Sequence, residues 1–214
     1  MINRFIHFSD NENILLKHLR IAKFQEIFEY VEEKFSELYI PEKDICIDES
    51  LMLWKGRLSW KQFIRTKRSR FGIKSFSFCE SSSGYIWSSC LYTGKELTDK
   101  LKSIYDSRYH YVATHIVLYL MKHLLGKGYC LYLDNWYNSI ELAKCLIANK
   151  TDCIGTLISS RKGLPKQLMR TKLNIGECVN AFDSESNLMI TKWKDKMDVC
   201  LISTCVGSDL WVNV

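Results

Sequence analysis

Two aspartates in this sequence follow short apolar runs that are typical of β-strands. Asp48 follows Ile45-Cys46-Ile47, and Asp134 follows the run from Tyr129 to Leu133. Carboxylates are hard oxygen ligands of the kind that Mg²⁺ prefers, and enzymes that transfer phosphoryl groups commonly hold two such ions between them. Metal ligands also need rigid supports such as strand ends. Asp48 and Asp134 are therefore candidate catalytic and metal-binding residues, with Mg²⁺ in a two-metal site as the expected cofactor.

A purely structural interpretation of the same residues is also open, because Asp is common in turns at strand ends. Glu49 would face the opposite side of a strand from Asp48, so we interpret it as structural. His115 and His123 fall in an expected helix and are interpreted as core or edge residues. No histidine pairs with a Cys or Ser in a nucleophile pattern, and no glycine loop that would cradle a phosphate is present.

Two segments are rich in basic residues. Residues 55–74 contain eight Lys or Arg and no acid, with Trp60, Phe63 and Phe71 among them. This pattern favours contacts with DNA phosphates, although a solvated basic loop would have the same composition. The candidate DNA-binding residues are Lys55, Arg57, Lys61, Arg65, Lys67, Arg68, Arg70 and Lys74 in this segment, and Arg161, Lys162 and Lys166 in the second one.

Composition excludes several classes of protein. The chain has 214 residues, a net charge of +6 and nine cysteines, an odd number with no CxxC pair. The first ten residues lack the apolar core of a secretory signal, and no apolar stretch is long enough to cross a membrane. Free cysteines among apolar neighbours favour a reducing compartment, the cytosol or the nucleus. We expect no membrane partner and no small-molecule cofactor.

Hydrophobic spacing predicts the elements that would position these side chains. Apolar residues recur every three or four positions over 13–38, which predicts a helix that Pro41 ends. Ser81-Ser82-Ser83-Gly84 predicts a turn that joins two strands in a hairpin, and Asn138 with Glu141 resembles a helix-starting capping box. The expected strands are 45–48, 71–79, 85–92, 129–133, 152–158, 188–193, 199–204 and 210–214, the further helices are 109–125 and 139–148, and 161–172 is an expected basic loop.

The resulting order is a helix, then β-β-β-α-β-α-β, then a β-rich tail. This order is that of the α/β ribonuclease H-like fold with a mixed sheet, in which the strands carrying Asp48 and Asp134 are neighbours. We therefore expect a helical lead-in over 1–42, a ribonuclease H-like core over 43–158, and a basic loop followed by a β-rich segment over 159–214.

Six short blocks follow one another along nearly the whole chain. They are Arg4 to Phe8; Ile47 to Ser50 with Lys55 to Arg57 and Phe71 to Lys74; Ser83 to Tyr85 with Tyr92 to Lys95; Gly126 to Tyr129 with Leu133 to Ser139; Gly155-Thr156 with Arg161 to Lys166; and Trp193 to Val199 with Leu201 to Thr204. In this collinear order they resemble the blocks of piggyBac transposases. A proline that is usual in that family before Phe71-Gly72 is absent here, where Lys67-Arg68-Ser69-Arg70 stands.

The resemblance implies a metal-dependent DNA-cutting and DNA-joining core that excises an element and inserts it at TTAA. Asp48 and Asp134 would be the first two members of an Asp-Asp-Asp set, and 159–214 would belong to the family's insertion region. The third member lies in a Gly-Gly-Val-Asp motif that does not occur up to Val214. Asp195, Asp198 and Asp209 lie in an expected hairpin or turn, so we do not expect any of them to replace it.

We therefore expect the 214-residue chain to be inactive by itself. DNA is the implied partner and the nucleus the implied location, and a homodimer stays open. Two alternatives compete with a transposase-derived nuclease core: a non-catalytic DNA-binding remnant that uses only its basic segments, and a protein-interaction module that retains the fold for stability.

Overall fold

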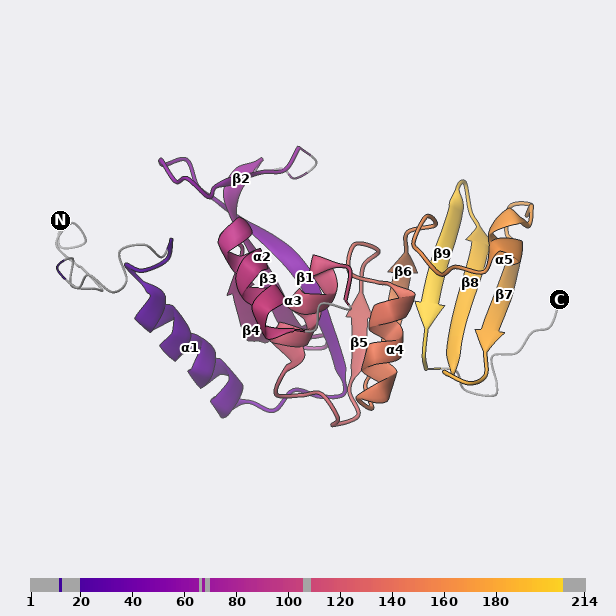
Figure 1. The fold of residues 1–214 in the computed structure, drawn as a ribbon, viewed down its shortest axis with the longest axis horizontal. Helices are drawn as coiled ribbons and strands as arrows, with labels where there is room; N and C mark the ends of the chain where they lie inside the picture. Colours follow the sequence, from indigo (N-terminus) through magenta and orange to yellow (C-terminus); the bar gives the residue numbers. More distant parts are fainter. Residues whose placement is uncertain (1–11, 13–19, 66, 68–69, 106–108, 206–214) are drawn as a thin grey trace.

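A mixed α/β arrangement around a nine-stranded sheet forms the described part of the molecule (Figure 1). This computed structural model describes residues 12, 20–65, 67, 70–105 and 109–205. The strands are β1 (Asp44–Leu53), β2 (Gln62–Phe63), β3 (Phe71–Glu80), β4 (Ile86–Leu91), β5 (Cys130–Leu133), β6 (Asp152–Leu157), β7 (Cys178–Asp183), β8 (Leu188–Lys194) and β9 (Asp198–Ser203). The helices are α1 (Gln25–Leu38), α2 (Lys95–Ile104), α3 (Val112–Met121), α4 (Ile140–Ala148) and α5 (Lys166–Arg170).

The centre of the sheet is parallel and its flanks are antiparallel. The strand order is β2-β3-β1-β5-β6-β9-β8-β7, with β4 also paired to β3. β5 runs parallel to both β1 and β6, whereas the β1–β3, β6–β9, β8–β9 and β7–β8 pairs are antiparallel. In Figure 1, α2, α3 and α4 all lie on one side of the central strands. Parallel strands need a long crossover connection. The connection from β5 to β6 runs through α4, and that from β1 to β5 contains β2, β3, β4, α2 and α3.

The core lies between the central strands and these helices. Alternation along β1 buries Ile45 and Ile47, while the cross-strand residues Phe76 and Phe78 of β3 are buried on the same face. The helix α3 supplies an almost continuous buried surface, as expected for a helix covered on several sides. Among the described residues, no helix is both long and apolar enough to cross a membrane.

Several sequence-based predictions are confirmed. β3 and β4 form the expected hairpin across the turn at 81–84. Strand β5, helix α4 and strand β6 follow in the predicted order within one or two residues of their expected ends. The later strands β8 and β9 pair as an antiparallel hairpin. The expected strand at 210–214 lies outside the described residues.

Other predictions need correction. The first strand does not end at Asp48 but continues to Leu53, because the long strand β3 pairs with it along its whole length. α1 begins at Gln25, after a turn over 20–24, whereas 13–19 lie outside the described residues. The predicted 109–125 helix is shorter, since α3 covers only Val112–Met121. The sequence analysis missed α2, β2 and β7, and the expected basic loop at 161–172 contains α5.

Asn138 is not a helix cap but a bridge between two strands. Ser139 is the N-cap of α4, and its hydroxyl accepts a hydrogen bond from the backbone N–H of Leu142 at 3.0 Å. The buried Asn138 amide instead donates to the backbone carbonyls of Leu133 at 3.1 Å and Thr156 at 2.8 Å. It therefore ties the carboxyl ends of β5 and β6 together.

Gly155 makes room for this bridge. A Cβ atom at Gly155 would lie 1.8 Å from the Leu133 carbonyl oxygen and 2.6 Å from the Asn138 amide nitrogen. Any side chain at this position would collide with the backbone of β5, so close approach of the two strands requires glycine.

We predict that Asn138→Ala lowers the free energy of unfolding by about 2 to 4 kcal/mol, because the buried Leu133 carbonyl and the partly buried Thr156 carbonyl lose their donor. Urea denaturation followed by circular dichroism would measure the change. Asn135→Ala is the matched control, since this exposed side chain lies three residues earlier, and it should change stability by less than about 0.5 kcal/mol. Equal losses for the two variants would contradict a bridging role.

Candidate active site at the carboxyl end of the parallel strands

The parallel pairing of β1 with β5 brings Asp48 and Asp134 to the same place. The last residues paired between these strands are Ile47 and Leu133, and each aspartate is the next residue along its chain. β1 continues past this point along β3, whereas β5 ends there. Asp48 and Asp134 therefore occupy neighbouring positions on adjacent strands, at the carboxyl end of β5. Ligands of α/β proteins commonly bind at this end of the parallel strands.

Both carboxylates are exposed and each is oriented by one backbone N–H group. Asp48 Oδ1 accepts a hydrogen bond from the N–H of Glu49 at 2.7 Å, and Asp134 Oδ1 accepts one from the N–H of Trp136 at 2.9 Å. These bonds leave a second carboxylate oxygen on each residue for another ligand. Both side chains are thus fixed by their own backbone and open to the solvent.

The buried side chain of Tyr137 lies close enough to these carboxylates for their charges to change its pKa. The Tyr137 hydroxyl is fully buried, and no hydrogen-bond partner for it occurs among the described residues. Burial raises the pKa of Tyr137, and the negative charges of Glu49, Asp48 and Asp134 raise it further. Three acidic side chains therefore act on one point, which gives this end of the sheet a negative potential that favours a cation.

The carboxylates fit a hard divalent cation such as Mg²⁺, with most of its coordination left to water or substrate oxygens. Asp48 and Asp134 are the residues that would hold it. Within the part of the chain that the structure describes, no cluster of three or more His, Cys, Asp or Glu side chains could hold a metal ion. The described residues thus offer two protein ligands rather than a complete cage.

Lys74 lies against the aromatic residues next to the second aspartate. Its ammonium group is 4.7 Å from the ring centroid of Phe76 and 5.0 Å from that of Trp136, and those two rings stack at 5.6 Å. Burial lowers the pKa of Lys74, and the charges of Glu49, Asp134 and Asp48 act in the opposite direction. The lysine is thus held beside the carboxylates by cation–π contacts, a position that sequence spacing alone did not reveal.

Glu49 and Asp48 are adjacent in the continuous strand β1, so their side chains face opposite sides of the sheet, as predicted. Glu49 forms an ion pair with Lys67 at 3.4 Å. This ion pair connects Glu49 to the basic segment 55–74.

Arg161 contacts the turn that carries Asp134. Its guanidinium donates hydrogen bonds to the backbone carbonyls of Asn135 at 3.2 Å and Trp136 at 2.5 Å, and it lies 4.5 Å from the ring centroid of Tyr111. The sequence analysis predicted Arg161 as a DNA-binding residue. Its Nη2 group donates to the protein backbone, so positioning the Asp134 turn is the interaction that the geometry supports.

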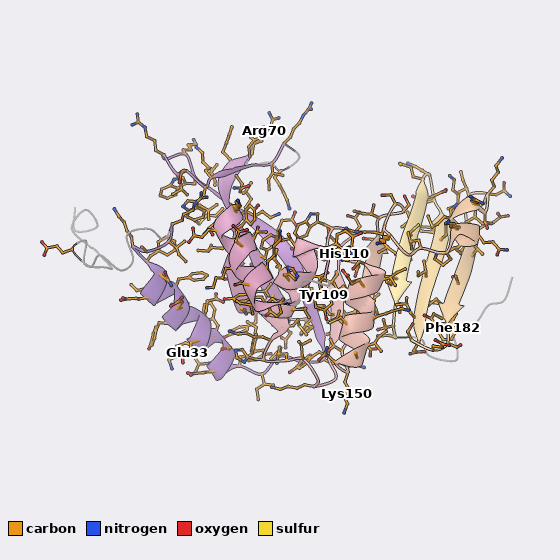
Figure 2. All side chains as sticks on the ribbon, in the orientation of Figure 1. Glu33, Arg70, Tyr109, His110, Lys150 and Phe182 are labelled. Atoms are coloured by element: carbon orange, nitrogen blue, oxygen red, sulfur yellow. The ribbon has the colours of Figure 1, made fainter. Side chains whose placement is uncertain are left out.

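The side chains of the other predicted DNA-binding residues differ in their exposure to solvent. The exposed ones are Lys55, Arg57, Arg65, Arg70, Lys162 and Lys166, the half-buried ones are Lys61, Lys67 and Lys74, and Arg68 lies outside the described residues. Figure 2 shows Arg70 near the end of the segment around β2 that projects from the body. Lys166 begins α5, so the second basic segment is partly helical.

Two of the three candidate replacement aspartates, Asp195 and Asp198, are described, and both lie in the β8–β9 hairpin rather than at this site. Asp198 forms ion pairs with Lys192 at 3.1 Å and with Lys194 at 2.7 Å within the β8–β9 pair. These two lysines lower the pKa of Asp198, mainly through their hydrogen bonds to it. Asp195 lies in the turn of that hairpin, and Asp209 lies outside the described residues.

The sequence profile of the family described as Transposase IS4 matches residues 1–214. The chain belongs to this transposase family. A cryo-EM structure of a piggyBac transposase synaptic complex with hairpin DNA is similar to 99% of this chain, with a TM-score of 0.85 and 25% sequence identity. The transposase chain described here spans 44% of the length of that protein. Its fold is that of the catalytic domain of a piggyBac-type transposase, which confirms the family inferred from the six sequence blocks.

The sequence analysis missed the side chains that position Asp134 in this transposase domain. Trp136, Tyr137 and Asn138 begin two residues after the aspartate. The backbone N–H of Trp136 donates to Asp134, the Tyr137 ring packs edge-on against Phe76, and the Asn138 amide bridges β5 and β6. The signal was present, because three large or polar residues in a row after a strand are unusual for a simple turn. Their targets on β3 and β6 could not be read from local sequence.

We predict that Arg161→Ala lowers the free energy of unfolding by about 1 to 3 kcal/mol, because it removes charged hydrogen bonds and a cation–π contact. Lys162→Ala is the matched control, since Lys162 is exposed and should contribute less than about 0.5 kcal/mol. Chemical denaturation of both variants would measure the difference. If Arg161→Ala instead weakened only DNA binding, its assignment as a positioning residue would be wrong.

Proposed function

We propose that this chain is the ribonuclease H-like core of a metal-dependent DNA-cutting and DNA-joining transposase, with Asp48 and Asp134 as catalytic metal ligands. The observation that supports this most strongly is the β1–β5 register, in which the two aspartates directly follow the last paired residues. Family membership adds support, because the similar solved protein is a transposase bound to hairpin DNA. TTAA as the preferred target and the nucleus as the location are parts of the same proposal.

The chemistry proposed for the site is in-line displacement at a DNA phosphate. Asp48 and Asp134 would hold a divalent cation, which would supply charge stabilisation in that displacement. Backbone hydrogen bonds preset the orientation of both carboxylates. Arg161 keeps the Asp134 turn in place, so that the second carboxylate does not move during a reaction that tolerates little displacement.

Lys74 is proposed to bind the phosphate next to the one being cut. Its ammonium group is close to both carboxylates but is held by aromatic rings rather than by a direct ion pair with either one. A cation in this position can neutralise a neighbouring phosphate without occupying the metal ligands. The exposed basic residues of segment 55–74 would extend the contacts along the DNA backbone.

The second candidate function is DNA binding without catalysis. The observation in its favour is that the described residues provide two carboxylates and no third acidic or histidine ligand beside them. The basic segments alone would then produce salt-dependent, largely sequence-independent affinity. Both candidates require DNA binding, and only the first requires strand cleavage.

We predict that the purified polypeptide of residues 1–214 binds duplex DNA with an affinity that falls steeply with salt. Arg70→Ala should reduce the slope of log K against log salt by about 1, because one phosphate contact is lost. Lys196→Ala, an exposed lysine in the β8–β9 turn, should leave the slope unchanged. Fluorescence anisotropy at four or more salt concentrations would measure it, and absent or salt-independent binding would leave only the protein-interaction module.

The same polypeptide should not nick DNA in Mg²⁺, because the piggyBac resemblance implies a third aspartate that residues 1–214 do not contain. Supercoiled plasmid relaxation followed on agarose gels is the measurement. Robust nicking that Asp48→Ala abolishes would show that two carboxylates suffice and would exclude the purely DNA-binding function.

Metal binding can be tested without activity. We predict that Mn²⁺ binding, measured by electron paramagnetic resonance of the free ion, weakens at least about tenfold in Asp134→Asn, because one of two charged ligands is lost. Asp195→Asn is the control, as Asp195 is exposed in the β8–β9 turn. If both variants bound Mn²⁺ as the unmodified chain does, Asp134 would not be a metal ligand.

A further inference from the structure

The segment around β2 exposes aromatic rings on a strongly basic surface. Trp54, Phe63 and Phe71 are 42%, 56% and 50% exposed, and we call these three side chains the hairpin patch. Phe63 and Phe71 are paired across β2 and β3, and their ring centroids are 4.7 Å apart. Large aromatic side chains are usually buried, so a group of exposed rings indicates a binding surface.

Local contacts hold these rings in place. The backbone N–H of Trp54 donates a hydrogen bond to the backbone carbonyl of Phe71 at 3.3 Å, which joins the end of β1 to the start of β3. Gly56 lies directly against the indole, since a Cβ atom there would be 2.8 Å from Trp54 Nε1. Lys61 lies 5.4 Å from the Phe71 ring centroid and donates to the Gly56 carbonyl at 3.3 Å. A preset arrangement of this kind lowers the entropy lost on binding.

The charge around the hairpin patch selects the kind of partner. Residues 55–74 contain no acidic side chain, and Lys55, Arg57, Arg65 and Arg70 are exposed. Figures 1 and 2 show β2 and Arg70 projecting from one end of the sheet. A partner that is both polyanionic and able to cover flat apolar rings is a nucleic acid with accessible bases. Bases inside a duplex are already stacked on each other, so the accessible ones are unpaired.

We propose that the hairpin patch stacks unpaired bases of a DNA strand. The proposal rests on the DNA binding proposed above and adds a base-contacting surface to its phosphate contacts. Leu53, the last residue of β1, is five residues beyond Asp48, which corresponds to roughly 17 Å along an extended strand. Bases bound at the patch would therefore lie roughly 17 Å from a phosphate at the carboxylates.

The first experiment compares two single-stranded oligonucleotides of equal length and charge. One is oligo-dT, and the other has the same backbone with abasic spacers at every position. We expect the unmodified chain to bind the abasic strand roughly 5- to 30-fold more weakly by fluorescence anisotropy, because stacking on the rings is lost while phosphate contacts are kept. Equal affinity for the two strands would overturn the proposal.

The second experiment removes single rings. Trp54→Ala and Phe63→Ala should each weaken oligo-dT binding roughly fivefold or more, with less than about twofold change for the abasic strand and for duplex DNA. Trp193→Ala is the matched control, because Trp193 is 40% exposed on β8, far along the sheet from β2 in Figure 1. Equal losses for Trp54→Ala and Trp193→Ala would overturn the proposal. Circular dichroism of each variant would verify folding. The conservative variant Phe63→Tyr keeps an aromatic ring and should bind oligo-dT as the unmodified chain does.

The remaining outcomes separate this inference from the function on which it rests. If the chain bound no DNA of any form, the proposed function and this inference would both fail. If it bound duplex DNA with the expected salt dependence but ring removal had no effect on single strands, only this inference would fail. A dimer in analytical ultracentrifugation that Trp54→Ala converts to a monomer, without a change in oligo-dT affinity, would assign the patch to contact with a second copy.

Discussion

The parallel pairing of β1 with β5 is the constraint on which the site depends. Its register ends at Ile47 and Leu133, so the next residue of each strand is an aspartate at the same end of the sheet. The neighbouring β5–β6 pair supports this end through Asn138, whose amide bridges the carbonyls of Leu133 and Thr156. Because the bridge needs Gly155 beneath it, the geometry of the carboxylates is linked to the core of the molecule.

Charge around this end of the sheet is arranged in two layers. The exposed carboxylates of Asp48 and Asp134 face the solvent, while Lys74 is partly withdrawn between Phe76 and Trp136. Burial lowers the pKa of Lys74 even though three carboxylates surround it. A half-buried cation close to acidic ligands balances their repulsion without neutralising them directly, which suits a site that must bind both a metal ion and a phosphate.

The basic residues of the chain do not act as a single surface. Arg161 is directed at the backbone of the Asp134 turn, and Lys67 pairs with Glu49, so these cations stabilise the protein. Among the predicted DNA-binding residues, the exposed ones lie instead on the segment around β2 and over 162–166. The amino-acid composition does not distinguish exposed basic residues from those that contact the protein. Only an exposed side chain can reach DNA phosphates without first breaking contacts within the protein.

Local sequence determined the β3–β4 hairpin, strand β5, helix α4 and the positions of both aspartates after apolar runs, because these depend on periodicity and turn residues close in the chain. It missed α2 and β7, whose apolar stripes are short, and it ended the first strand at Asp48. Only the tertiary structure decided that β3 extends β1 to Leu53, that Asn138 bridges strands rather than capping a helix, and that Arg161 faces inward. Each of these depends on partners distant in the sequence, and a residue's own neighbours carry no information about such partners.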